Sequence, residues 1–347
     1  CVTQTGDQGG NVARAAVLRA GWSDQTAALT VNNLCASSLS ATSLAAGRIA
    51  LGEELVVAGG VESMSRVPMA ADQPPFIVDP VVVQQLSALP IGVAADVIAT
   101  RALYTREQID AYAVQSQQRA AAARRSGRFA RSLLAVHDAQ GHLVLEQDET
   151  IRENTRLEKL LTMAPYFAEM GRQWADAMAL QQWPELGEVK HFHHAGNSPA
   201  MADGASAVLL ASAAGAQRHG LKIRARLLAQ AQCSGNRSMA LLGAIESSQL
   251  ALARAGLSAA DIDLYEVNEA FAAPAIHYAQ TLGIPLDRVN VNGGAIALGH
   301  AMGATGTNLI GMAIDERERR GGRYALVAVS GALGLGAATI IERVSPG

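Results

Sequence analysis

Two segments near opposite ends of the chain share an order of features that restricts the fold to an α/β architecture. Residues 30–60 run from Thr-Val-Asn-Asn through a helical stretch of small side chains to the apolar run Leu55–Ala58 and two glycines. Residues 290–331 run from Asn-Val-Asn-Gly through a glycine turn and a helical stretch to an apolar run and a glycine. Strands that alternate with helices predict a mainly parallel sheet with helices on its faces. The weak repeat predicts two similar halves whose equivalent helix N-termini face each other; the alternative is chance similarity between Ala/Gly-rich segments.

The texture of the sequence changes between these two segments. Prolines interrupt the chain from Pro74 to Pro90, a helix is predicted over 106–125, and polar, irregular sequence continues to Lys190. The α/β texture then returns, with strands predicted at 205–211, 263–267 and 324–329 and a helix at 247–255. The middle part therefore resembles an inserted lobe rather than more of the sheet.

Composition excludes several classes of partner. The chain has 347 residues, of which 49% are hydrophobic and 17% charged, and its net charge is −3. This balance gives no general field for nucleic acid or an anionic membrane surface. We identify no signal peptide and no apolar run of the roughly 20 residues that span a bilayer, so no membrane partner is expected. The chain starts at Cys1 rather than Met, and we expect further residues before it.

Cysteine and histidine usage argues against structural cross-links. The cysteines are Cys1, Cys35 and Cys233, without CxxC spacing, which favours neither a disulfide framework nor a zinc site and indicates a reducing, cytoplasmic setting. The densest histidine cluster, at 191–194, has no second ligand pair at metal-binding spacing, so we predict no metal and interpret it as a loop.

Cys35 is the first candidate for chemistry. It lies just before a predicted helix of small side chains, where the macrodipole and free N–H groups favour the thiolate and lower the thiol pKa. A thiolate is a good nucleophile towards thioesters, and a histidine can activate it further. The alternative is a buried cysteine that acts as a small hydrophobic residue.

Three further candidates lie in the C-terminal part. His300 sits between two glycine-rich turns, where it can transfer protons or donate to an oxyanion. Asn268 follows a predicted strand, where it can hold a water or act as a helix N-cap. Ser330 begins the turn Ser-Gly-Ala-Leu-Gly-Leu-Gly, which is not a dinucleotide fingerprint and whose N–H groups can form an oxyanion hole.

The order and spacing of these elements resemble the thiolase family. Asn268 begins Asn-Glu-Ala-Phe-Ala-Ala, His300 follows 32 positions later at the end of Asn-Val-Asn-Gly-Gly-Ala-Ile-Ala-Leu-Gly-His, and Ser330 follows after 30 more. Further matches are Gly-Gly-Val-Glu-Ser-Met-Ser at 59–65 and Ser-Gln-Gln-Arg-Ala at 116–120. The resemblance covers essentially the whole chain, and family members begin with a further strand and helix.

The resemblance implies a thiolase fold. This fold has two βαβαβαββ halves in a five-layered α-β-α-β-α arrangement, with an inserted loop domain over the acyl-CoA site. The N-terminal half would comprise residues 1–71 and 191–220, the loop domain 72–190, and the C-terminal half 221–347.

The resemblance also implies a reaction. Thiolases are acyltransferases that cleave 3-ketoacyl-CoA with CoA, giving acetyl-CoA or propionyl-CoA and a shortened acyl-CoA, or run the reverse condensation. In that family Cys35 would carry the acyl group, His300 would activate it, and Asn268 would fix an oxyanion-hole water. Coenzyme A would be a substrate, with no permanently bound cofactor, and the enzyme would be a homodimer or homotetramer.

The sequence departs from the family at Ser330, where thiolases carry a second cysteine that moves a proton. A serine hydroxyl is far more basic than a thiol, so we expect a loss of roughly 10²- to 10⁴-fold in that step. Ala332 and Ala301 also replace a usual glycine and proline. The alternatives to a thiolase are therefore an acyl-CoA-binding pseudoenzyme and a condensing or hydrolytic relative.

Two weaker predictions concern the substrate. Pro90-Ile-Gly resembles degradative, β-oxidation-type members more than short-chain biosynthetic ones. The basic side chains of Arg124, Arg125 and Arg128 can meet the CoA phosphates; the alternative is a solvated helix end.

Overall fold

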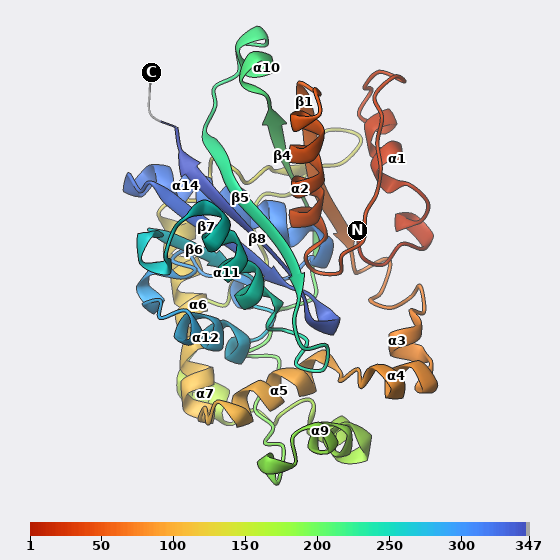
Figure 1. Cartoon of the computed structure of the whole chain (residues 1–347), viewed down its shortest axis with the longest axis vertical. Coiled ribbons are helices and arrows are strands. Elements are labelled where there is room, and N and C mark those ends of the chain that lie inside the picture. Colours follow the sequence, from red (N-terminus) through yellow and green to blue (C-terminus); the bar gives the residue numbers. More distant parts are fainter. Residues whose placement is uncertain (345–347) are drawn as a thin grey trace.

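The computed structural model describes residues 1–344 and contains two separate layers of sheet (Figure 1). The smaller layer pairs β1 with β4, and the larger has the order β5-β8-β7-β6. A third sheet is a short hairpin that pairs residues 136–137 with 143–145. The N-terminal elements are α1 (Val12–Arg19), α2 (Ser37–Ala50), β1 (Leu55–Ser63), β4 (Asp203–Ala211) and α10 (Ala213–Arg218). The C-terminal elements are β5 (Ala225–Ser234), α11 (Gly243–Ala255), β6 (Leu264–Val267), α12 (Ala272–Thr281), α13 (Ala295–Leu298), α14 (Thr305–Arg320), β7 (Tyr324–Ser330) and β8 (Leu335–Arg343).

The C-terminal part follows the order β5-α11-β6-α12-α13-α14-β7-β8. Between α12 and α14, where the expected βαβαβαββ order has a third strand, Val289 forms a single parallel bridge with Tyr265. On one face of the large sheet α11 packs against β5, β8 and β7, and on the other face α14 packs against β6 and β7. The buried apolar side chains form two matching clusters, one on each face of the sheet.

The predicted internal repeat is confirmed. α2 leads into β1, which pairs antiparallel with β4, as α14 leads into β7, which pairs antiparallel with β8. α2 packs on β1, α14 packs on β7, and the two helices also contact each other between the sheets. Their first turns meet, because the backbone N–H of Thr307 donates to the Ser38 hydroxyl at 3.1 Å.

The prediction of a mainly parallel sheet is wrong. Among the strands of residues 1–344, only β6 and β7 pair in parallel as full strands. The alternation of strands and helices did not reveal that β7 returns directly into β8 through the short turn 331–334. It also did not reveal that β1 pairs with β4 across the long intervening segment.

That intervening segment is largely helical. Its elements are α3 (Pro75–Val78), α4 (Pro80–Leu86), α5 (Ile91–Arg101), α6 (Arg106–Arg125), the short strands β2 (Val136–His137) and β3 (Leu143–Leu145), α7 (Leu157–Leu161), α8 (Ala168–Met170) and α9 (Asp176–Gln182). The helix predicted over 106–125 is α6, which starts with a capping box at Thr105 and Gln108. The limits of the predicted loop domain, 72 and 190, stay predictions, as do those of the two halves.

One part of this segment differs from expectation. Residues 80–101 contain an 18-residue window with a mean hydropathy of 1.6 and are, by length and composition alone, sufficient to cross a membrane. They form two helices, because Ser87 adopts the left-handed conformation (φ 50°) and Pro90 follows it. α5 buries Val93, Val97 and Ile98 in a core cluster that also contains Phe271. Neither helix has the ~20 residues of a spanning helix. The apolar side chains of α5 are explained as core structure, whereas α4 buries no residue.

We expect the strand-to-turn contact at Gly60 to be essential for folding. A Cβ atom at Gly60 would overlap the carbonyl oxygen of Gly303 and lie 2.6 Å from the Ala304 Cα. Gly60→Ala should therefore lower the free energy of unfolding by about 1–3 kcal/mol in denaturant titrations. Gly47→Ala is the matched control, because a Cβ there meets open space in α2 and should stabilise by about 0.5–1 kcal/mol. Equal effects of the two substitutions would contradict this view of the contact.

Candidate active site

Cys35 lies in a strained turn just before α2. The preceding residue, Leu34, adopts the left-handed conformation (φ 49°), which side chains other than glycine rarely take. Three hydrogen bonds hold the turn: Ser37 Oγ donates to the Leu34 carbonyl (2.6 Å) and accepts from the Asn33 N–H (2.9 Å), while Asn32 Oδ1 accepts from the Leu34 N–H (2.9 Å). Strain of this kind persists only where the surroundings impose it, and it is common at functional sites.

The predicted lowering of the Cys35 pKa is wrong. Burial raises the pKa of the Cys35 thiol to about 12, opposed by the residue's own backbone N–H and reinforced by the Glu62 carboxylate. The thiol does lie two residues before the start of α2, as expected. Desolvation outweighs the helix terminus, because a thiolate in a buried setting loses its hydration. Cys35 therefore rests as a thiol and needs a base to become a nucleophile.

His300 supplies a neutral imidazole. Its backbone N–H donates to the Ala200 carbonyl (2.9 Å), and its Nδ1 pairs with the Thr305 hydroxyl (2.7 Å). Its buried Nε2 has no hydrogen-bond partner among residues 1–344. Burial lowers the pKa of His300 to about 4, against a smaller opposing effect of Glu62. The ring is thus uncharged near pH 7 and has one nitrogen free for a reacting group.

Glu62 ties the surroundings of Cys35 and His300 together. Its carboxylate raises the pKa of both groups, and it accepts the Gly303 N–H of the turn after His300 (2.9 Å). Gln8 Nε2 also donates to it (2.8 Å). The sequence motif around Glu62 suggested the family but gave this residue no role.

Asn268 and Ser330 end neighbouring strands. Asn268 follows β6, its N–H donates to the Ala328 carbonyl (2.9 Å), and neither atom of its side-chain amide has a partner within residues 1–344, although it is buried. The N-cap interpretation of Asn268 is wrong, because α12 begins at Ala272 with Phe271 as its N-cap. A buried amide without a protein partner indicates a site for water or for a ligand oxygen.

Ser330 ends β7 and reaches the start of α11. Its Oγ accepts the Ala244 backbone N–H (2.9 Å), so it lies at the helix N-terminus. A Cβ atom at the following residue, Gly331, would lie 3.4 Å from the Leu34 Cβ. The turn after Ser330 therefore abuts the turn that holds Cys35, and each of these two residues lies at the N-terminus of a helix.

Comparison with known proteins identifies this arrangement. The thiolase N-terminal domain family matches residues 1–179, and the thiolase C-terminal domain family matches residues 221–343. The chain belongs to the thiolase family. It is 40% identical to a 3-ketoacyl-CoA thiolase of Erwinia tasmaniensis over 99% of the chain and 86% of that protein. It is also 40% identical to the 3-ketoacyl-CoA thiolase of Pseudoalteromonas translucida, over 99% and 85%.

A solved structure agrees with this assignment. The crystal structure of human mitochondrial 3-ketoacyl-CoA thiolase superposes with a TM-score of 0.85 and 32% identity, covering 99% of this chain and 85% of that one. The predicted thiolase fold is thereby confirmed.

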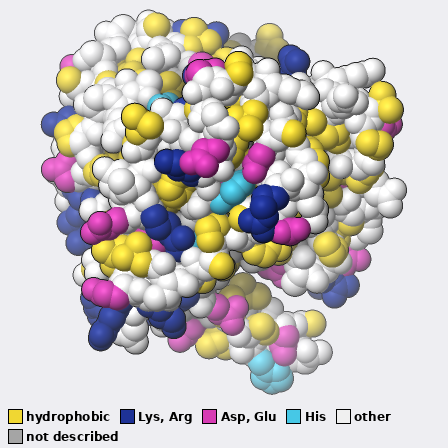
Figure 2. Space-filling view, turned by 90° about the horizontal axis from the view of Figure 1, so that it is seen from below, with side chains coloured by type: hydrophobic (Ala, Val, Ile, Leu, Met, Phe, Trp, Pro, Cys, Tyr) yellow, Lys and Arg dark blue, Asp and Glu magenta, His cyan; other side chains and the backbone are white. Residues whose placement is uncertain are grey.

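The three arginines predicted to bind CoA have partners within this thiolase. Arg124 and Arg125 pair with Glu153, the former at 3.7 Å, and Arg128 donates to Asn292 Oδ1 at 2.8 Å. On the face seen in Figure 2, basic and acidic side chains lie interspersed rather than in patches of one sign. CoA phosphates would have to compete for these arginines, and their role stays a prediction.

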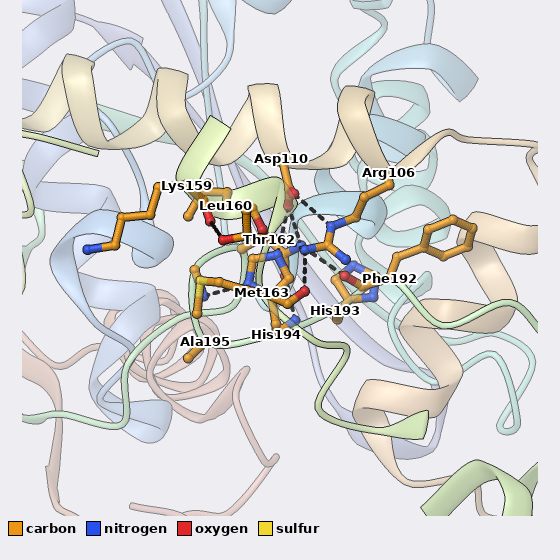
Figure 3. A network of polar contacts seen from close by, with 12 residues as sticks. Arg106, Asp110, Lys159, Leu160, Thr162, Met163, Phe192, His193, His194 and Ala195 are labelled. Carbon is orange, nitrogen blue, oxygen red and sulfur yellow. Dashed lines mark hydrogen bonds and ion pairs between the residues drawn. The ribbon is translucent and has the colours of Figure 1, made fainter. Parts of the chain in front are cut away.

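The histidine cluster builds a structural network in the thiolase (Figure 3). Buried Asp110 accepts hydrogen bonds from Arg106 (2.7 Å), His194 (2.9 Å) and Asn197 (2.7 Å). Burial alone would raise the pKa of Asp110, but these donors hold that pKa below its ordinary value. The interpretation as a loop is confirmed, because residues 191–194 have neither helical nor strand structure.

The raised pKa of Cys35 predicts slow alkylation of the free enzyme. With iodoacetamide, carboxamidomethylation of the Cys35 peptide should be slower at pH 7 than in the urea-unfolded chain, whose thiols titrate near their ordinary pKa of about 8.5. The rate in the folded enzyme should still rise at pH 9, because the thiolate fraction grows with pH far below a pKa of about 12. The alkylation rate is measured by mass spectrometry of the Cys35 peptide. A rate that reaches a plateau at or below pH 8 would show that the fold stabilises the thiolate and would contradict the raised pKa.

Proposed function

We propose that this thiolase cleaves 3-ketoacyl-CoA with CoA through an acyl group on Cys35. The proposal is carried by one observation: the half-buried Cys35 thiol lies just before α2, whose first turn is hydrogen-bonded to that of α14, and the turn leading into α14 carries His300 with its free Nε2. The relatives named above as 3-ketoacyl-CoA thiolases support the choice of substrate.

The first half-reaction needs one base and one oxyanion site. His300 Nε2 takes the proton from Cys35 Sγ, and the sulfur attacks the 3-keto carbon. The new imidazolium N–H then faces the oxygen on which negative charge develops, and a water on the free Asn268 amide adds a second donor. Collapse of the oxyanion breaks the C2–C3 bond and leaves the acyl group on sulfur. The electron pair of that bond remains on C2 as an acetyl-CoA enolate, which must be protonated.

The second half-reaction reverses the roles. The thiol of a second CoA loses its proton and attacks the acyl-sulfur carbonyl, and Cys35 leaves as a thiolate that regains a proton. Both half-reactions therefore need a second proton carrier besides His300, one that protonates C2 of the enolate and later takes the proton of the CoA thiol. In the family this is the cysteine at the position of Ser330, whose hydroxyl here accepts the Ala244 N–H. A serine hydroxyl stays protonated near pH 7 and cannot act as the base in this proton transfer. We therefore propose that proton transfer on the substrate side limits turnover.

Substrate range, assembly and location are further proposals. The Pro90-Ile91-Gly92 turn favours a degradative, β-oxidation-type enzyme, and Gly92 lies so close to the Phe167 ring that a Cβ there would overlap it. We propose acyl-CoA and CoA as the partners, with Arg124, Arg125 and Arg128 as candidate contacts. A homodimer or homotetramer and a cytoplasmic location rest on the family resemblance and on the sparse cysteines.

Acylation of Cys35 tests the proposal directly. Incubation with a 3-ketoacyl-CoA, without free CoA, should add the mass of the shortened acyl group to the Cys35 peptide and to no other cysteine. Cys35→Ala should abolish the shift while leaving the thermal unfolding midpoint near that of the wild type. An unmodified wild-type Cys35 under these conditions would eliminate the thiolase activity and leave the acyl-CoA-binding pseudoenzyme.

Replacement of the serine tests the proton-transfer argument. Ser330→Cys places a thiol at the N-terminus of α11, where the Ala244 N–H and the helix dipole favour a thiolate. We expect steady-state thiolysis to rise by roughly 10²-fold or more, while the rate of Cys35 acylation in a single turnover changes little. A gain in turnover below about tenfold would refute the view that Ser330 limits the reaction.

A further inference from the structure

The buried carboxylate of Glu269 lies next to Asn268 and is not used in the proposed reaction. It follows Asn268 directly and is 1% exposed. Four donors converge on it: Tyr112 Oη (2.9 Å) and Asn290 Nδ2 (3.0 Å) on Oε1, and Ser116 Oγ (2.7 Å) and the Ile296 N–H (3.1 Å) on Oε2. Because two donors bind each of its oxygens, this buried carboxylate rigidly connects the segments that carry those donors.

The four donors come from two different parts of the chain. Tyr112 and Ser116 lie on α6, in the segment between β1 and β4. Asn290 lies in the loop before α13 and Ile296 in α13 itself, which together lead to His300. The same face of α6 holds this loop by further bonds. Gln117 Nε2 donates to the Ile296 carbonyl (3.0 Å), and Arg119 donates to the Val289 carbonyl (2.7 Å).

The glycines of the loop are explained by this contact. Gly293 has φ +80°, and a Cβ atom there would lie 2.6 Å from the Ser116 carbonyl oxygen. A Cβ atom at Gly294 would overlap the Glu269 carboxylate, and the Gly294 N–H donates to Ser116 Oγ (3.1 Å). The loop backbone is thus pressed onto Glu269 and α6, and only α13 and Gly299 separate it from His300.

We propose that Glu269 is a positioning residue that sets His300 and Asn268 relative to Cys35, with α6 as its outer support. It reaches Asn268 through the adjacent peptide unit and His300 through Ile296 and α13. A carboxylate is required because all four partners donate; the amide of a glutamine would turn two N–H donors towards them. The inference rests on the proposed function, since it assumes that His300 and Asn268 act on the acyl group.

Glu269→Gln is the decisive variant, with single-turnover acylation of Cys35 as the readout. We expect the acylation rate per folded chain to fall by about 10²-fold, because a misplacement of about 1 Å at a reacting group has an effect of that size. The KM for the 3-ketoacyl-CoA should change by less than about threefold, since Glu269 is buried beneath the site. Glu269→Asp keeps the acceptors and should recover part of the lost rate.

Two tyrosine variants serve as matched controls. Tyr112→Phe removes one hydrogen bond to Glu269 and should slow acylation by about tenfold. Tyr104→Phe removes a partly buried hydrogen bond to Gln280 (2.6 Å) away from the site and should leave the acylation rate unchanged. Tyr112→Phe also stands in for Glu269→Gln if the latter does not fold.

Each outcome has a distinct meaning. A wild-type acylation rate per folded chain in Glu269→Gln, or equal effects of the two tyrosine variants, would overturn the positioning role. A loss that follows only the folded fraction, measured by circular dichroism on the same samples, would also overturn it. If wild-type Cys35 itself is not acylated, the proposed function has failed. That result is distinct from a failure of the positioning role, which requires an acylated wild type and an unaffected variant.

Discussion

The contact between the first turns of α2 and α14 is the constraint on which the site depends. Gly306 permits it, because a Cβ atom there would lie 2.6 Å from the Leu39 backbone nitrogen, and the bond from Thr307 to Ser38 secures it. Both helices lie between the two sheets, so their N-terminal ends are held in one place by packing on both sides. Cys35 stands at the start of one helix and His300 just before the other. The close approach therefore brings together the two helix starts that carry the proposed catalytic residues.

Burial of this pair also determines its resting charge. The same desolvation that raises the pKa of Cys35 to about 12 lowers that of His300 to about 4, so thiol and imidazole both rest uncharged. In the proposed mechanism, charge appears only when the proton moves from Cys35 to His300 during attack, the step in which oxyanion donors are useful. The unpartnered Asn268 amide and His300 Nε2 are consistent with this arrangement, because polar atoms left without protein partners in a core are costly unless a substrate or water uses them.

Buried carboxylates organise the rest of the site, and each is defined by its surroundings. Three of them are surrounded by hydrogen-bond donors. Glu62 holds the turn after His300, and Glu269 holds the segment before it. Asp110 holds Arg106, which in turn binds the end of α7. Glu266 is the contrast: neither oxygen has a partner within residues 1–344, and burial, with Glu316 and Glu269 nearby, raises its pKa well above the ordinary value. It lies on β6, two residues before Asn268, which follows that strand.

The sequence by itself determined the local elements and the chemistry of single residues. Glycine turns, small-residue helices and the motifs around Cys35, Asn268 and His300 are local patterns, and they were sufficient for the fold family, for α6 and for the internal repeat. Strand direction, the pKa values and the role of Glu269 were decided only by the tertiary structure. Pairing depends on which strand lies beside which, and desolvation depends on everything packed around a group. Glu269 gathers donors from α6 and from a loop far along the chain, a convergence that no spacing in the sequence expresses.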